Sequence, residues 1–297
     1  MTAELRPAAL HAHRTWRTTK SQIMTGLMVA ALFAVLVPLV SVMGSVVARG
    51  ARIAFADFPA FFTSEIPVIS RLAGPGMGPA ILGTLLCTLG ATLIAVPLGI
   101  LGAIYLHEYG GTSKFARLVR FMATVMTGVP SIVMGLFVYI MWTLRFGYSA
   151  FGGALALAAL MLPVVIASTE QMLRLVPGHL REAAYALGTS KSRTILTVVV
   201  PAALPGIISG CLLAVARAAG ETAPLLFALG LGATAFNTSF FSEINTALSQ
   251  QIFVNASSAF AGAQERAWGA ALTLVLLTFL LTVIARVFTA RLALKRA

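Results

Sequence analysis

Residues 174–201 read RLVPGHLREAAYALGTSKSRTILTVVVP, a polar and basic stretch between two long apolar runs. A Pro-Gly pair near its start ends the helix expected before it, and apolar residues at helical spacing predict a short helix over 179–187. One side of this helix is expected to hold Leu180, Ala183, Ala184 and Leu187. Gly188 can take the left-handed conformation that closes such a helix, and a second helix is expected from Ser190 onward. We call this predicted two-helix segment, residues 173–199, the knuckle.

The knuckle has the features of a docking surface. Its small alanines allow another surface to approach closely, while Glu182, Lys191 and Arg193 offer polar contacts at the rim. A connection that only joined two helices could be much shorter and would need no such shape. We therefore expect the knuckle to contact another protein, with a plain linker as the alternative.

The rest of the chain is strongly apolar. Of its 297 residues, 59% are hydrophobic and 10% are charged, whereas soluble domains are about half apolar and about a quarter charged. The apolar residues form separate runs, each long enough to cross a hydrocarbon core of about 30 Å as a helix. These runs are 22–48, 79–106, 117–143, 150–172, 200–230 and 267–290. The sequence thus predicts an all-α membrane protein with six transmembrane helices.

Prolines occur inside most of these runs. They are Pro38, Pro97, Pro130, Pro163, Pro205 and Pro224. A membrane helix tolerates proline where neighbouring groups satisfy the freed carbonyl. The prolines predict kinked helices around a central pathway, although the ordinary composition of membrane helices also accounts for them.

Lys and Arg are unevenly distributed among the connecting segments. If the N-terminus is cytoplasmic, fifteen lie on the cytoplasmic side, five lie on the outer side and one, Arg217, lies inside a span. This bias predicts that both termini are cytoplasmic. The first apolar run is longer than the core of a cleaved signal peptide, so we expect it to be retained. The expected parts are a cytoplasmic N-terminal segment (1–21), a first transmembrane helix with an outer loop (22–78), a main transmembrane domain that contains the knuckle (79–290) and a cytoplasmic tail (291–297).

Several other functions are disfavoured. The net charge of +12 is spread over short loops rather than one face, which argues against nucleic-acid binding. Cys87 and Cys211 lie inside apolar runs and are expected to be packing residues, so neither redox chemistry nor a metal site is predicted. The stretch GGTSK at 110–114 lacks the Gly-Lys pair of a phosphate-binding loop, and no catalytic residue is predicted.

The outer segment 231–266 contains a candidate amphipathic helix. Ile244, Leu248, Ile252 and Phe253 are spaced for one face of a short helix. Such a helix either lies on the membrane surface, where it could face an external partner, or packs on the bundle.

The stretch RAAGETAPLLFALG (217–230) places Arg217 and Glu221 four residues apart inside an apolar run. A charged residue within a membrane span costs about 2.5–3.5 kcal/mol on insertion scales, whereas a helical i,i+4 pair contributes only about 0.2–0.5 kcal/mol in water. We therefore expect the pair to line a translocation path, with an internal salt bridge that fixes helix packing as the alternative. Pro224 would loosen the helix close to such a site.

The two side chains suit a particular kind of solute. Arg217 offers a planar fork for an oxyanion, and Glu221 can accept a hydrogen bond from a protonated one, which favours hydrogen phosphate over sulfate. Whether Glu221 selects the proton or only holds Arg217 stays open. Further pathway candidates are Thr222, Thr169 and Glu170. For Thr169 and Glu170, a position at the membrane-water boundary is the simpler interpretation.

The knuckle also carries a motif. This motif resembles the signature Glu-Ala-Ala-x3-Gly-x9-Ile-x-Leu-Pro of the ABC importer permeases, with Val at both aliphatic positions. It consists of Glu182-Ala183-Ala184, Gly188, Val198, Val200 and Pro201. The resemblance implies a type I (MetI-like) importer fold, in which this loop docks into a separate ATPase that binds ATP and Mg²⁺, while this chain binds no cofactor. The residues it implies for this contact are Arg181, Glu182, Ala183, Ala184, Gly188, Lys191 and Arg193.

The charged stretch and the knuckle together resemble the permeases of bacterial phosphate importers, over about residues 80–290 and most strongly over 163–228. This implies a plasma-membrane complex with a sister permease, two ATPase subunits and an extracytoplasmic phosphate-binding protein, with Arg217 and Glu221 as the family's charged pair. An importer of molybdate, sulfate or a small organic anion is the first alternative, and pairing with a second copy stays open. A secondary transporter is the second alternative, although no convincing internal repeat supports it.

Overall fold

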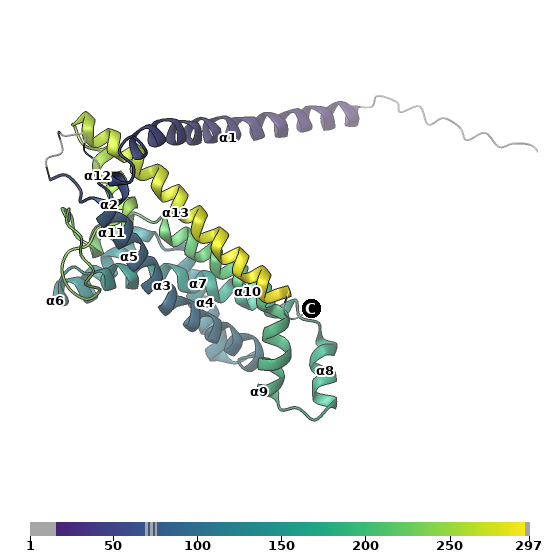
Figure 1. Ribbon diagram of the computed structural model, residues 1–297. Helices are drawn as coiled ribbons and strands as arrows, with labels where there is room; N and C mark the ends of the chain where they lie inside the picture. Colours follow the sequence, from purple (N-terminus) through teal and green to yellow (C-terminus); the bar gives the residue numbers. More distant parts are fainter. Residues whose placement is uncertain (1–15, 69–70, 72–73, 75, 295–297) are drawn as a thin grey trace, which may run out of the picture. The chain divides into compact units, whose positions relative to one another are not determined.

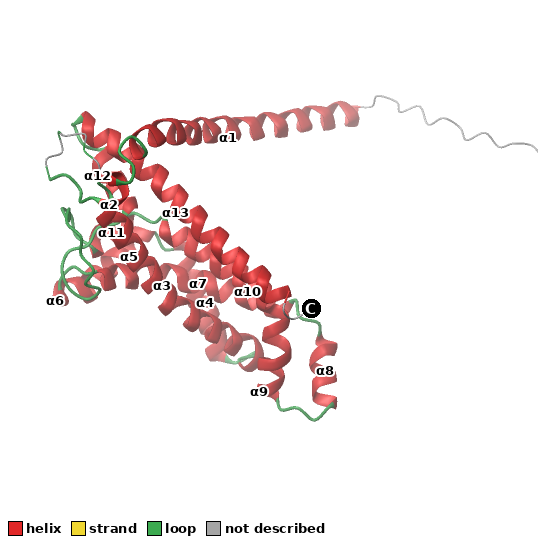
Figure 2. Cartoon of the chain, viewed as in Figure 1, coloured by secondary structure: helices red, strands yellow, loops and turns green. Residues whose placement is uncertain are grey.

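The structure is a computed structural model that describes residues 16–68, 71, 74 and 76–294. The regular structure is helical throughout these residues, and no strand occurs among them (Figure 2). The predicted all-α class is thus confirmed. The N-terminal segment (1–21) and the tail (291–297) lie partly outside the described residues, and their cytoplasmic placement stays a prediction.

Among the described residues, five helical stretches are long and apolar enough to cross a membrane. Their main helices are α1 (Trp16–Ala54), α3 (Gly78–Ile104), α7 (Ala150–Arg174), α10 (Val200–Ala219) and α13 (Ala261–Leu294). A π-helical turn, Tyr105–Tyr109, continues α3. Similarly, α9 (Lys191–Thr194) and a second π-helical turn, Ile195–Val199, lead into α10. A bent pair of helices supplies the remaining predicted span, which is the third in chain order.

The bent pair lies where the sequence predicted a span over 117–143 with Pro130 inside it. Its elements are α4 (Lys114–Gly128), α5 (Ser131–Val138), the π-helical turn Tyr139–Thr143 and α6 (Leu144–Phe146). The helix direction is bent by 107° between the two halves. Val129 is extended (ψ 129°) because the proline that follows it disfavours helical backbone, and Pro130 then starts α5. The kink predicted for a span with Pro130 inside it is therefore present, at Val129 and Pro130.

The fifth predicted span, 200–230, is also divided. Its helix α10 ends at Ala219, residues 220–222 are not helical, and the short helix α11 (Ala223–Ala228) follows with Pro224 in its first turn. Towards the knuckle, the helix begins at Lys191 with Ser190 as its N-cap residue, which agrees with the predicted start.

The chain divides into two compact units, 1–47 and 48–297. In the first unit, every residue of α1 from 20 to 44 is exposed, and most of them are apolar. A helix that is apolar all round needs an apolar environment on every side, as the interior of a membrane provides.

In the second unit, α7 is the central helix and packs against α3, α10 and α4. Small residues bring these helices close together, as where Gly99 lies against Val165 and Gly153 against Cys87. Both cysteines are buried and free, as predicted, and the Cys87 thiol lies 3.6 Å from the Ala150 carbonyl. The core of the unit therefore rests on close helix packing.

The long helices of the second unit run between two ends (Figure 1). One end, which we call the α8 end, holds α8 (Gly178–Ala186) and α9. The other, the α12 end, holds α2 (Ala60–Thr63), α11 and α12 (Leu248–Ala256).

The helix predicted in the outer segment is α12, and it packs on the bundle against α13 and α3. Its buried side is mainly polar, with Ser249, Gln250, Gln251 and Asn255 beside Leu248. Ile244 and Phe253, expected on the apolar face, are exposed instead. Hydrogen bonding to the bundle rather than apolar burial orients this helix.

Candidate functional site

The predicted charged pair lies at the break between α10 and α11. Arg217 is in the last turn of α10, where a cation is favourable at the helix C-terminus, and Glu221 lies beyond the helix end. Arg217 Nε is 3.6 Å from Glu221 Oε1, with 71% of the Arg217 side chain exposed but only 19% of the Glu221 side chain. The sequence suggested that both residues lie on one continuous helix, but the helix ends between them. Most of the Arg217 side chain is accessible.

The backbone of the break is held from two sides. The Glu221 amide donates to the Ala218 carbonyl at 3.1 Å, and the Ser249 hydroxyl on α12 donates to the Glu221 carbonyl at 2.9 Å. Thr222 is half-buried, and its carbonyl accepts the first amide hydrogen bonds of α11. Non-helical backbone within an apolar span is tolerated only where protein or water satisfies its polar groups. The break is therefore suited to a polar cavity rather than to lipid.

A buried amide network supports this region from α12. Gln251 Nε2 donates to Thr246 Oγ1 at 2.9 Å, Asn255 Nδ2 donates to Gln251 Oε1 at 2.9 Å, and Gln250 Nε2 donates to the Gly230 carbonyl. Sequence reasoning missed Ser249 and these amides because it looked for an apolar face. The run SQQ at 249–251 was the available signal.

An exposed stripe on α10 leads along the helix to the charged pair. Pro205, Ser209, Leu213 and Arg217 repeat at intervals of four residues and are all exposed. Residues at this spacing share one face of a helix. A face that ends on an arginine must meet water, a solute or another protein, because lipid is a poor environment for that charge.

The weaker pathway candidates lie elsewhere. Ser168, next to Thr169, packs against Gly210, which lies about 10 Å before Arg217 along α10. Thr169 is fully buried, and its hydroxyl has no hydrogen-bond partner among the described residues. The structure therefore does not bring Thr169 or Glu170 together with the charged pair.

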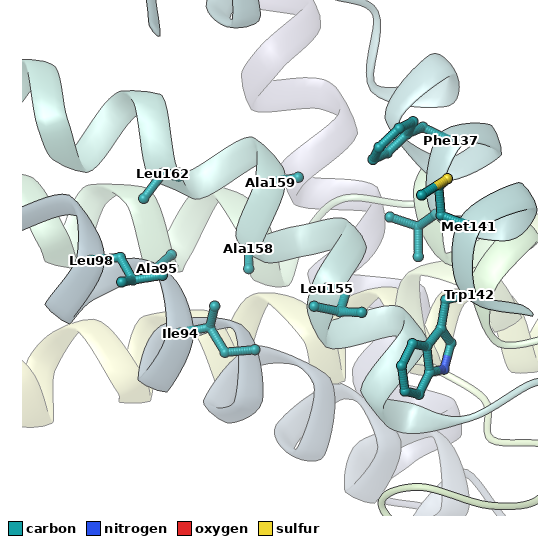
Figure 3. A pocket seen from close by; sticks show the side chains of 11 residues that line it. Ile94, Ala95, Leu98, Phe137, Met141, Trp142, Leu155, Ala158, Ala159 and Leu162 are labelled. Atoms are coloured by element: carbon teal, nitrogen blue, oxygen red, sulfur yellow. The ribbon is translucent and has the colours of Figure 1, made fainter. Parts of the chain in front are cut away.

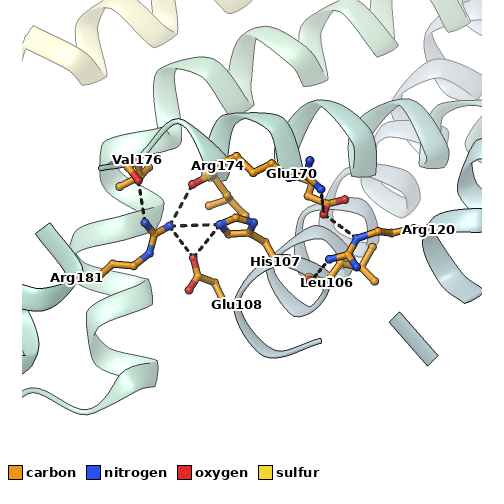
Figure 4. Close-up of polar contacts among 9 residues, drawn as sticks. Leu106, His107, Glu108, Arg120, Glu170, Arg174, Val176 and Arg181 are labelled. Carbon is orange, nitrogen blue, oxygen red and sulfur yellow. Dashed lines mark hydrogen bonds and ion pairs between the residues drawn. The ribbon is translucent and has the colours of Figure 1, made fainter. Parts of the chain in front are cut away.

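Glu170 belongs to a compact ion-pair cluster (Figure 4). Its Oε1 accepts from Arg120 Nε at 2.8 Å and from Arg174 Nη2 at 2.9 Å, and only 9% of its side chain is exposed. Arg120 also donates to the Leu106 carbonyl at 2.5 Å and to the Gly111 carbonyl at 3.3 Å. The cluster thus joins α4 and α7 to the end of α3. Sequence reasoning missed Arg120 because it lies fifty residues from its partner.

Two cavities lie along these helices. A cavity of about 370 Å³ between α4 and α7 is lined partly by the ion-pair cluster and by Thr124 and Thr127. A second, of about 300 Å³, lies among α3, α5 and α7 and is lined almost wholly by apolar side chains (Figure 3). The second cavity offers no charged group to an ion.

The knuckle forms as the sequence predicted. The helix α8 is closed by Gly188 with φ +77°, and α9 follows after Ser190. The outward residues are Glu182, Ala183, Tyr185, Leu187, Lys191 and Arg193, whereas Ala184 is buried and Leu180 packs on the core. Of the four residues expected on the apolar side, Ala183 and Leu187 are exposed instead, and α8 ends one residue before Leu187.

Arg181 is the exception on α8, because its side chain turns towards the bundle. Its Nη2 lies 3.0 Å from Glu108 Oε1 and 3.1 Å from the Leu173 carbonyl, and its Nη1 lies 2.8 Å from the Val176 carbonyl (Figure 4). Within the chain, Arg181 makes these contacts with α7 and with the end of α3, and the contact with an ATPase that the resemblance implied for it stays a prediction. Sequence reasoning did not single out Glu108.

Comparison with known proteins places this arrangement in a family. Residues 95–294 match the family described as the binding-protein-dependent transport system inner membrane component. The chain belongs to this family. As one of its permeases, the chain is similar to proteins named phosphate transport system permease protein PstA. It is 43% identical to the protein from Mycobacterium leprae, over 88% of this chain and 86% of that protein, and 42% identical to the one from Yersinia pestis, over 94% and 92%.

The fold of the permease is also found among solved structures. A chain of the MetNI methionine ABC transporter, crystallised in an inward-facing conformation, superposes with a TM-score of 0.55 at 18% sequence identity. The match covers 72% of this chain and 92% of that chain. It supports the predicted MetI-like fold.

Proposed function

We propose that this permease translocates inorganic phosphate into the cytoplasm as the membrane subunit of an ATP-driven importer. The observation that carries the proposal is the mostly exposed Arg217 side chain beside a break in an apolar span, at 3.6 Å from Glu221. Relatives that are 36–43% identical over most of the chain are named as phosphate transport permeases.

Arg217 supplies the attraction for the anion. Its fork can donate two hydrogen bonds to neighbouring oxygens of a tetrahedral oxyanion, and its charge persists at physiological pH. A translocation site must also release its ion, so the site should be weak. The ion pair suits this purpose, because Glu221 remains close enough to take back the guanidinium when the anion leaves.

Glu221 supplies discrimination in this proposal. An ionised carboxylate repels a fully deprotonated anion, but it accepts a hydrogen bond from the hydroxyl of hydrogen phosphate. Sulfate carries no such proton at neutral pH. The same pair would therefore attract phosphate and disfavour sulfate.

The knuckle is the proposed docking site for an ATPase. Its outer surface combines a small apolar patch of Ala183, Tyr185 and Leu187 with a charged rim, and it lies at the α8 end. In the proposed complex, a sister permease, two ATPase subunits and an extracytoplasmic phosphate-binding protein complete the importer. Both termini and the knuckle are then cytoplasmic, and closure of the ATPases moves the knuckle so that the bundle opens alternately to each side.

Uptake of labelled phosphate by the reconstituted complex tests the proposal. The Arg217→Gln variant should lose at least about thirtyfold in uptake, because a charge-assisted interaction of about 2 kcal/mol is removed, while the complex still assembles. Arg145→Gln provides a matched control, because Arg145 is exposed on α6, which is neither of the two helices that flank the break. Unchanged uptake by Arg217→Gln would refute the pathway role.

The same vesicles separate the alternatives. Transport of molybdate, sulfate or a small organic anion in place of phosphate would identify a different importer. Phosphate uptake that needs no ATPase would identify a secondary transporter.

A further inference from the structure

The π-helical turn at the end of α3, Tyr105–Tyr109, is held by both helices of the knuckle. From α8, Arg181 pairs with Glu108 at 3.0 Å. From α9, the Lys191 ammonium lies 4.8 Å from the centroid of the Tyr109 ring. The backbone joins the knuckle only to α7 and α10, so these two contacts are additional connections to α3.

Arg181 makes the stronger of these connections. Only 18% of its side chain and 7% of the Glu108 side chain are exposed. Each charge-assisted hydrogen bond contributes about 1.5–3 kcal/mol, and such interactions gain strength away from water. The Leu173 carbonyl that it also binds lies in the last turn of α7, where carbonyls lack helical partners, and the Val176 carbonyl lies two residues beyond the end of α7. Arg181 therefore ties α8, α7 and α3 together at one point.

These contacts bridge a joint in the chain. The connection from α7 to α8 consists of residues 175–177, which are not helical. Without a side-chain connection across it, a push on α8 could be absorbed by bending at this joint. Because Arg181 bonds to groups on both sides of the joint, α8 and the ends of α7 and α3 should move together.

We propose that Arg181 is a positioning residue that transmits movement of the knuckle to α3. This inference rests on the proposed function, in which an ATPase docks on α8. The backbone does not join the knuckle to α3. The Arg181 contacts would therefore pass the movement of the knuckle to α3 through side chains. Lys191 on α9 assists, because its contact with Tyr109 holds the same turn from the second side.

Contacts of α3 at the α12 end show where the movement would arrive. Near the start of α3, the Thr84 hydroxyl accepts a hydrogen bond of 2.8 Å from the Leu248 amide. The next residue, Ser249, donates to the Glu221 carbonyl. A displaced α3 would therefore act, through the first turn of α12, on the break that carries Arg217.

The test uses the complete importer in lipid vesicles and measures phosphate transported per ATP hydrolysed. Arg181→Gln should assemble and hydrolyse ATP, but its transport per ATP should fall about tenfold, the effect of losing about 1.4 kcal/mol of coupling. Glu108→Gln should act in the same direction, and the double variant should lose little more. Arg117→Gln is the matched control, because Arg117 is an exposed arginine on α4 that forms no ion pair within the described part of the chain.

Arg181→Lys separates transmission from folding, because lysine keeps the charge but loses the fork. This variant should assemble and should transport an amount of phosphate per ATP between that of the unaltered importer and that of Arg181→Gln. Three results would each overturn the inference. They are an unchanged amount of phosphate transported per ATP in Arg181→Gln, additive effects of Arg181→Gln and Glu108→Gln, and failure of both Arg181 variants to assemble. Failure of the unaltered importer to transport phosphate would instead refute the proposed function, and the amount of its actual solute transported per ATP in Arg181→Gln would then decide the role of Arg181.

Discussion

Two Arg–Glu arrangements in this chain use the same chemistry in opposite ways. At the α8 end, Glu170 binds Arg120 and Arg174 at 2.8 and 2.9 Å, and its side chain is almost fully buried. At the break, Arg217 and Glu221 are 3.6 Å apart, and the arginine is mostly exposed. A guanidinium that is already bound to a carboxylate and to carbonyls has few donors left, whereas Arg217 retains its fork. The tight cluster therefore suits a structural role and the loose pair suits an external anion.

The largest effect on stability should come from the tight cluster. Glu170→Ala leaves two guanidinium groups without their carboxylate, so we expect the free energy of unfolding to fall by about 3 kcal/mol. Chemical denaturation in detergent, followed by circular dichroism, measures this. A loss below about 1 kcal/mol would contradict the structural role of the tight cluster.

Arg217→Lys should affect phosphate uptake strongly and stability little. The ammonium keeps the charge but cannot bind two oxygens with a planar fork, so phosphate uptake should fall about tenfold. The free energy of unfolding should change by less than about 0.5 kcal/mol, since exposed pairs contribute little. If stability fell as far as in Glu170→Ala, the loose pair would be structural.

The two arginines of the cluster should contribute differently to the free energy of unfolding. The side chain of Arg120 is 32% exposed and binds two carbonyls besides Glu170, whereas that of Arg174 is 60% exposed and binds only Glu170 among the described residues. Arg120→Gln should cost about 2 kcal/mol of stability and Arg174→Gln about 0.5 kcal/mol. Denaturation of the two variants side by side checks this order, and equal losses would contradict it.

The change in stability expected for Glu221→Gln is as small as that for Arg217→Lys, at under about 0.5 kcal/mol. Its effect should appear in selectivity, because the neutral amide no longer repels a fully ionised anion. Competition assays should show that sulfate inhibits phosphate uptake more strongly in this variant than in the unaltered importer. If sulfate competes equally in both, Glu221 only holds Arg217.

The prolines show how far the fold follows from sequence. Pro38, Pro97, Pro163 and Pro205 lie inside intact helices, whereas Pro130 and Pro224 stand at helix starts beside breaks. Local composition is similarly apolar around all six. The difference lies in tertiary packing, since Pro224 rests directly against Gly135 of α5, where no side chain would fit. Apolar runs thus predict the number and approximate positions of the spans, but not which ones break.

The site was predictable in the same uneven way. The knuckle is a local structure, so helix spacing and Gly188 were enough to predict it. Arg217 and Glu221 stood out because charge is rare in an apolar run. Partners that are distant in sequence, such as Arg120 for Glu170 or Glu108 for Arg181, depend on how whole helices pack, and no local pattern encodes that.

The exposed face of α10 also bears on biogenesis. A solitary copy of this chain in a bilayer would present Arg217 to lipid or to an unfilled cavity, a penalty of about 2.5–3.5 kcal/mol that a second subunit with a polar surface removes. Copies made in excess of their partners should therefore be less stable in the membrane than assembled ones. Membrane proteases that degrade loosely folded substrates would then keep the amount of this subunit matched to that of its partners.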